Sequence, residues 1–325
     1  MTESAAPKSS RYAILLGIGA LWLLALLWAL RATRAESGGP ESGLISTAQN
    51  LFQLVAAILA ASAAAGLFAV TTLRFATGAA RRLAVGAGAG ILLGVLSGAL
   101  ATAMIRDTRS SAVIAVCLVA AALVGGLASA VRPARVLAAG IAGTYAAFLA
   151  KVILGIFSPR LAPVFGAGKT IDTVNAAENR MLLAFGVVSG IVAGVVAFRY
   201  LHRGPAQHWA GYLAAGGVAG LLAILSEGFA WVTAPKLVAP LADFSGFAVD
   251  LLSTKIGPRV NSGIALLFAG AITATIMIGR TLRPAGEEPV EAPAPFAFPA
   301  DADQPEPVSV FGTPLPKTEK VTEDH

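Results

Sequence analysis

Charged residues are scarce in this chain of 325 residues and make up only 13% of it. In an average soluble domain about a quarter of the residues are charged. The hydrophobic content of 56% and the mean hydropathy of +0.74 point the same way. This composition argues against a soluble enzyme and a disordered protein, and it indicates a polytopic membrane protein.

Cysteine and histidine are nearly absent. Cys117 is the single cysteine, so no intrachain disulfide can form. The three histidines, His202, His208 and His325, have no metal-ligand spacing and no evident nucleophile beside them. We therefore expect no metal, no cofactor and no catalytic residue. A membrane enzyme ranks third among the functional alternatives.

Basic residues exceed acidic ones, 24 against 18, but they do not cluster. They stand mainly in pairs between long apolar runs, whereas nucleic-acid-binding proteins gather them on one face or stripe. We expect no nucleic-acid partner, and the lipid bilayer is the partner that the composition predicts.

Eight apolar runs are long enough, or nearly so, to cross a hydrocarbon layer of about 30 Å as helices. Their uniformly apolar character favours helices over the alternating pattern of a β-barrel. The predicted spans are residues 13–30, 48–70, 83–105, 111–131, 136–157, 181–200, 209–232 and 261–279. The predicted fold is an all-α polytopic integral membrane helical bundle with about eight transmembrane helices.

The two ends of the chain differ from this region. Residues 1–12 form a predicted disordered N-terminal segment, and residues 13–283 form the transmembrane domain. Residues 284–325 are rich in proline, alanine and acids, a composition that cannot bury enough apolar surface to fold. We expect a disordered tail there, with a docking segment for a soluble partner as the alternative.

The orientation rests on the loops after the second, fourth and sixth spans, which are short, basic and free of acids. Because short basic loops face the cytoplasm, we expect both termini there. The composition, rich in Ala, Gly and Val, resembles that of high-GC bacteria and favours the bacterial inner (plasma) membrane.

Glycines recur at every fourth position in three predicted spans. Residues four apart share one helix face, and rows of small residues let membrane helices approach closely. We predict glycine-zipper packing inside the bundle, or at a contact with a second copy or another membrane protein. The rows are Gly86, Gly90, Gly94 and Gly98; Gly186, Gly190 and Gly194; and Gly216 and Gly220.

Lys151 and Glu227 lie inside predicted spans, six residues before the end of the fifth and five before the end of the seventh. Both spans run in the same direction, so the two charges share a depth. Intramembrane charges are costly and mark functional sites. With Asn50, Gln53 and Asn261 at the same side, they predict a polar vestibule open to the outside. The alternatives are a structural ion pair and a snorkelling lysine.

Two outer connections are unusual. Residues 158–180 form a long predicted loop, and its FGAGKT segment resembles the end of a phosphate-binding loop. Pro163 stands where that motif requires its first glycine, so we interpret the segment as a flexible loop. Residues 241–256 predict a short helix that lies in the interface, re-enters the membrane or caps the bundle.

These observations identify no family. The function that they favour is a small-solute transporter or permease-like protein with an outward-facing polar vestibule. The alternative is a non-catalytic membrane scaffold or a partner subunit of a larger membrane complex, in which the glycine faces and the tail make the contacts.

Overall fold

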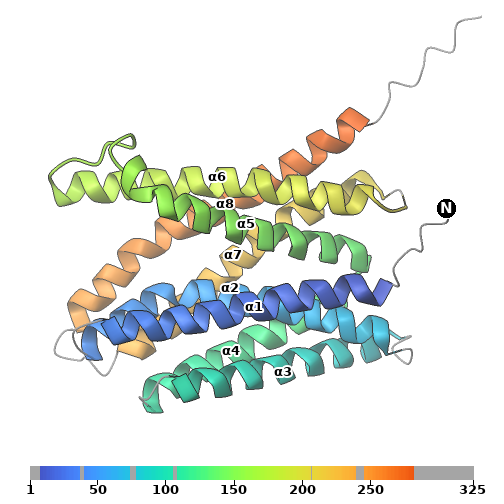
Figure 1. Ribbon diagram of the computed structural model, residues 1–325, viewed down its shortest axis with the longest axis horizontal. Helices are drawn as coiled ribbons and strands as arrows, with labels where there is room; N and C mark the ends of the chain where they lie inside the picture. The colour runs from blue at the N-terminus through green and yellow to red at the C-terminus, as the bar shows by residue number, and fades with distance from the viewer. Residues whose placement is uncertain are drawn as a thin grey trace, which may run out of the picture. The chain divides into compact units, whose positions relative to one another are not determined.

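The computed structural model describes residues 8–36, 40–73, 78–104, 108–205, 207–238 and 245–281. All regular secondary structure in these ranges is helical (Figure 1). The helices are α1 (Lys8–Glu36), α2 (Pro40–Thr72), α3 (Ala79–Met104), α4 (Thr108–Ala128), α5 (Ala134–Leu161), α6 (Ile171–His202), α7 (Trp209–Val238) and α8 (Ser245–Thr281). The predicted C-terminal tail lies outside the described residues.

Each of these eight helices contains a stretch long and apolar enough to cross a membrane. The prediction of eight spans is confirmed, and most of the spans are longer than predicted. The fourth is shorter and ends at Ala128. Residues 129–133 form turns and bends instead, because Pro133 disfavours helical backbone in the residue before it.

The predicted long loop between the fifth and sixth spans is wrong. α5 continues to Leu161 and α6 begins at Ile171, so only residues 162–170 connect them. The Thr170 side chain accepts a hydrogen bond of 3.4 Å from the backbone N–H of Thr173, as an N-cap does. Asp172 in the first turn adds a favourable interaction with the helix dipole.

The predicted short helix over residues 241–256 is also wrong as a separate element. α8 begins at Ser245 and runs without interruption to Thr281, so the predicted segment and the eighth span are one helix. The side chains of residues 245–256 lie outside the described part of the structure. α8 contains Pro258, and prolines also lie inside α5 (Pro159) and α7 (Pro235).

α2 is the most deeply buried span. Its side chains Val55, Ile58 and Leu59 are fully buried, and the helix contacts α1, α3, α4, α5 and α7. This central position brings α2 into contact with helices from both halves of the chain.

Glycines bring α3 against α4. A Cβ atom added at Gly94 would lie 2.8 Å from the Cα of Val119, and one at Gly90 would meet the Ala122 carbonyl oxygen. Figure 1 shows the two helices side by side. In the described structure this face of α3 is therefore in contact with the same chain.

α8 lies between α6 and α7 in the same way. A Cβ atom at Gly190 of α6 would lie 2.8 Å from the Cβ of Ala269, and one at Gly216 of α7 would meet the Gly270 carbonyl oxygen. These contacts fix the position of α8, which carries one wall of the site described next. A glycine zipper along the full rows stays a prediction.

Candidate ligand-binding cavity

A cavity of about 500 Å³ lies between α1, α2, α5, α6, α7 and α8. Ligand sites in proteins usually measure about 300–1,000 Å³. Its wall combines four charged and four aromatic side chains. They are Lys151, Glu178, Glu227 and Arg259, and Trp22, Phe52, Phe148 and Phe185.

Lys151 and Glu227 line this cavity at the same depth. Each lies ten residues before the end of its span, which finishes at Leu161 in α5 and at Leu237 in α7. At 1.5 Å per residue this is about 15 Å from the end of spans that are 28 and 29 residues long, so both charges lie between the middle of the span and that end. Both helices continue past the ends predicted from the sequence, and the two charges keep an equal distance from those ends.

Glu227 is buried, with only 3% of its surface exposed. Its Oε2 atom has no hydrogen-bond partner in the part of the chain that the structure describes. The charges of Arg259 and Lys151 both act on this carboxylate, and Glu178 acts on Arg259. Charges of both signs therefore act on one another at the cavity wall, and one carboxylate oxygen is left unsatisfied.

Aromatic rings support the charged wall. The guanidinium of Arg259 lies over the ring of Phe52, a cation–π contact between α8 and α2. Trp22 of α1 and Phe148 of α5 stack with ring centres 6.1 Å apart and an angle of 19° between their planes. These pairs connect helices that are distant in the sequence.

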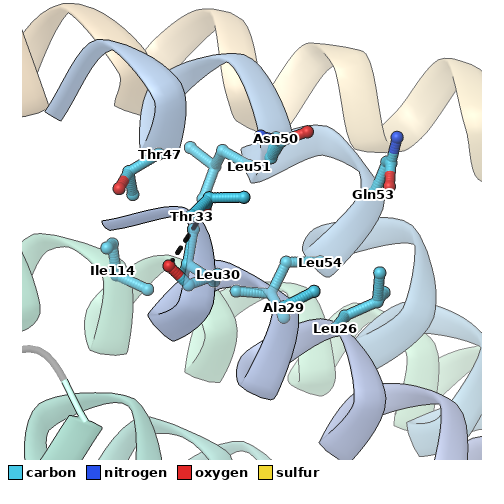
Figure 2. A pocket seen from close by; sticks show the side chains of 10 residues that line it. All are labelled: Leu26, Ala29, Leu30, Thr33, Thr47, Asn50, Leu51, Gln53, Leu54 and Ile114. Carbon is cyan, nitrogen blue, oxygen red and sulfur yellow. Dashed lines mark hydrogen bonds between the residues drawn. The ribbon is translucent and has the colours of Figure 1, made fainter. Parts of the chain in front are cut away.

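A second, smaller cavity of about 90 Å³ lies between α1, α2 and α4. Figure 2 shows that leucines such as Leu30 and Leu54 form much of its wall. Asn50 and Gln53 contribute polar groups from α2, and the Asn50 amide donates a hydrogen bond of 2.9 Å to the Ser46 carbonyl. Gln53 also lines the large cavity and so belongs to both.

The structure brings three predicted vestibule residues together, since Lys151, Glu227 and Gln53 line the large cavity. Asn50 lines only the smaller cavity. Asn261 is exposed and lines neither of the two.

Sequence reasoning missed Arg259 and Glu178. The predicted spans began at residues 261 and 181, which left both charges in loops. For Glu178 a signal existed, because Thr170 followed by Asp172 is a helix-start pattern that places the residue inside α6. For Arg259, Pro258 argued for a loop, although proline occurs inside membrane helices.

The FGAGKT segment forms part of the connection between α5 and α6. Gly166 has a φ of +89°, and Arg180 donates a hydrogen bond of 3.2 Å to the Phe165 carbonyl. Lys169 is exposed and does not line the large cavity. Because a helix rather than a strand precedes the segment, it does not form a phosphate-binding loop.

No protein-family model, curated protein or solved structure matches this chain. The eight helices among the described residues have the length and composition of a multi-pass membrane protein.

Proposed function

We propose that this protein binds a small polar solute in the large cavity and carries it across the bilayer, as a transporter or permease-like protein does. The observation that carries the proposal is the unsatisfied Oε2 of Glu227, at the depth of Lys151 in a cavity between six helices.

The cost of these charges supports a functional role. Placing a single charged side chain at the centre of a membrane helix costs about 2.5–3.5 kcal/mol on insertion scales. Packing alone would be served by apolar residues, which are often more stabilising than buried ion pairs. Charges retained around an open cavity are instead available to a solute.

The position of the cavity supports transport. Binding sites of secondary transporters lie between helices within the bilayer, where access alternates between the two sides, and this cavity likewise lies between membrane-spanning helices. We infer that both termini are cytoplasmic, in a bacterial inner membrane. In this orientation the loops after α1, α5 and α7 face outward, and Lys151 and Glu227 are reached from outside.

Two valines of similar exposure test for water in the cavity. Val152 of α5 is 47% exposed and lines the cavity, whereas Val188 of α6 is 43% exposed and does not. In a chain with Cys117→Ser, we expect a membrane-impermeant methanethiosulfonate reagent to label Val152→Cys in intact cells. Val188→Cys, which lies outside the cavity, stays unlabelled, and Lys320→Cys in the cytoplasmic tail stays protected.

If Val152→Cys is labelled only in opened membranes, water still reaches the cavity, but from the opposite side. The solute-binding proposal then stands, and the inferred orientation of the chain is reversed. If Val152→Cys resists the reagent on both sides while the protein remains folded, the cavity is dry. The scaffold or partner-subunit function would then replace the proposed one, and deletion of residues 284–325 would be the next test.

A further inference from the structure

We propose that the large cavity selects a zwitterion with an apolar side group, whose anionic group lies toward Lys151 and Arg259 and whose ammonium group binds Glu227. This inference rests on the proposed function, since it requires the cavity to bind a solute, and it adds the chemical class of that solute.

The first argument is the sign of the charges. Lys151 and Arg259 both act on Glu227, and all three line the same cavity. A simple anion would bring a second negative charge toward Glu227, and a simple cation would face both bases. A ligand with both signs meets each group with an opposite charge, which is how electrostatic complementarity produces specificity.

The second argument is the unsatisfied oxygen. Glu227 Oε2 is buried without a donor among the described residues, and such an atom carries a desolvation penalty. A primary ammonium group offers three N–H donors and forms short, charge-assisted hydrogen bonds with carboxylates. A quaternary ammonium group has no N–H and leaves the oxygen unsatisfied.

The third argument is the apolar wall. Trp22 and Phe148 stack on one another beside Lys151, and Phe185 and Met181 come from α6. Apart from the indole N–H of Trp22, these side chains are apolar, so they suit an aliphatic or aromatic side group. The volume of about 500 Å³ leaves room for such a group beside the charged ends.

Two sources supply this chemistry. One is a free apolar amino acid, and the other is the headgroup of an ethanolamine phospholipid, which joins a phosphate to a primary ammonium. Val152 and Gly155 line the cavity and are themselves exposed. Because this wall is open to the surroundings of α5, the experiment includes both sources.

The experiment measures equilibrium binding to the full-length protein in lipid-free detergent micelles. The zwitterionic probes are L-leucine, L-phenylalanine and glycerophosphoethanolamine. The matched half-ligands are 3-phenylpropionate, which lacks the ammonium, and phenethylamine, which lacks the carboxylate. We expect at least one zwitterion to bind, and each half-ligand of phenylalanine to bind at least ~10-fold more weakly than phenylalanine when that is the ligand.

Charge variants assign the two ends of the ligand. Glu227→Gln should weaken zwitterion binding by ~10-fold or more and leave 3-phenylpropionate binding unreduced. Lys151→Gln should weaken zwitterion binding and leave phenethylamine binding unreduced. The controls are Asp172→Asn and Lys169→Gln, which make the same changes at exposed positions outside the cavity and should bind like the unchanged protein.

The two proposals fail in different ways. If a half-ligand binds as tightly as every zwitterion, the proposal of a zwitterionic ligand is wrong. The proposal that the cavity binds a solute then still stands. Absence of binding by all probes overturns the zwitterion too, and labelling of Val152→Cys then decides whether the cavity takes solutes at all. Binding of glycerophosphoethanolamine alone, which has no apolar side group, overturns the apolar side group and assigns the site to a lipid headgroup.

Discussion

The guanidinium carbon of Arg259 lies 4.4 Å from the centre of the Phe52 ring. The two residues are far apart in the sequence, and their contact joins α8 to the most buried helix of the bundle. The ring face holds the cation at the cavity wall, where it acts on both Glu227 and Glu178.

Replacement of Phe52 by leucine tests this arrangement. The substitution keeps an apolar side chain and removes the ring face under Arg259. We expect solute affinity to fall by the value of a cation–π contact, about 0.5–2 kcal/mol. The measurement is equilibrium binding of the zwitterion that the cavity prefers. Phe68→Leu is the control, since Phe68 lies in the same helix but outside the cavity, and equal losses in both variants would contradict the role of the ring.

Lys151 and Glu227 should be energetically coupled. Lys151→Gln and Glu227→Gln each remove one charge and leave the opposite one less compensated, so each should lower the free energy of unfolding. The double variant should lose less than the sum, by about 0.5–3 kcal/mol. Denaturant titration in detergent micelles measures all three. The pair Arg199→Gln and Asp172→Asn, on exposed residues near opposite ends of α6, should be additive; additivity at Lys151 and Glu227 would contradict the coupling.

Two glycines of α3 should respond oppositely to alanine. A Cβ atom at Gly90 would meet the Ala122 carbonyl oxygen, whereas one at Gly88 would meet nothing within 4 Å. We expect Gly90→Ala to destabilise the protein by about 1–3 kcal/mol, as overpacking does. Gly88→Ala should be neutral or stabilising by up to ~1 kcal/mol through helix propensity. Thermal unfolding compares them, and similar midpoints would show that α3 and α4 are not in close contact.

A comparison of Gln53 with Asn261 tests whether lining the cavity matters for binding. Both are polar residues near the same end of the bundle. Gln53 lines both cavities, and Asn261 lines neither. We expect Gln53→Ala to change zwitterion affinity by ~3-fold or more, the scale of one neutral hydrogen bond. Asn261→Ala should leave it unchanged. A larger effect of Asn261 in equilibrium binding would assign the polar groups differently.

The sequence predicts the spans well because membrane crossing imposes a strong local rule. A run of about 20 apolar residues has few alternatives to a helix in the bilayer. The shared depth of Lys151 and Glu227 follows from span direction alone. Both are properties of short segments, so they need no knowledge of how the helices pack.

The other half of the site depends on contacts between distant segments. Charge marks Arg259 and Glu178 as loop residues, yet both lie in helices that continue past the apolar runs. Their environment is supplied by other helices, as Phe52 of α2 does for Arg259. Asn261 likewise lies outside the cavity because of the side that α8 turns toward α6 and α7. A hydropathy pattern does not specify that side.

The prolines inside α5, α7 and α8 make these helices easier to bend in one part than in the rest. Pro159, Pro235 and Pro258 all lie toward the loops that follow α5 and α7. Each lacks the N–H that would bond the carbonyl four residues earlier, and for Pro159 that carbonyl belongs to Gly155 at the cavity. Bending at these points breaks fewer hydrogen bonds than elsewhere in the same helices. The parts of these three helices that bend most easily thus lie on the same side of the bundle as the large cavity. The other half of each helix contains no proline and keeps all its backbone hydrogen bonds.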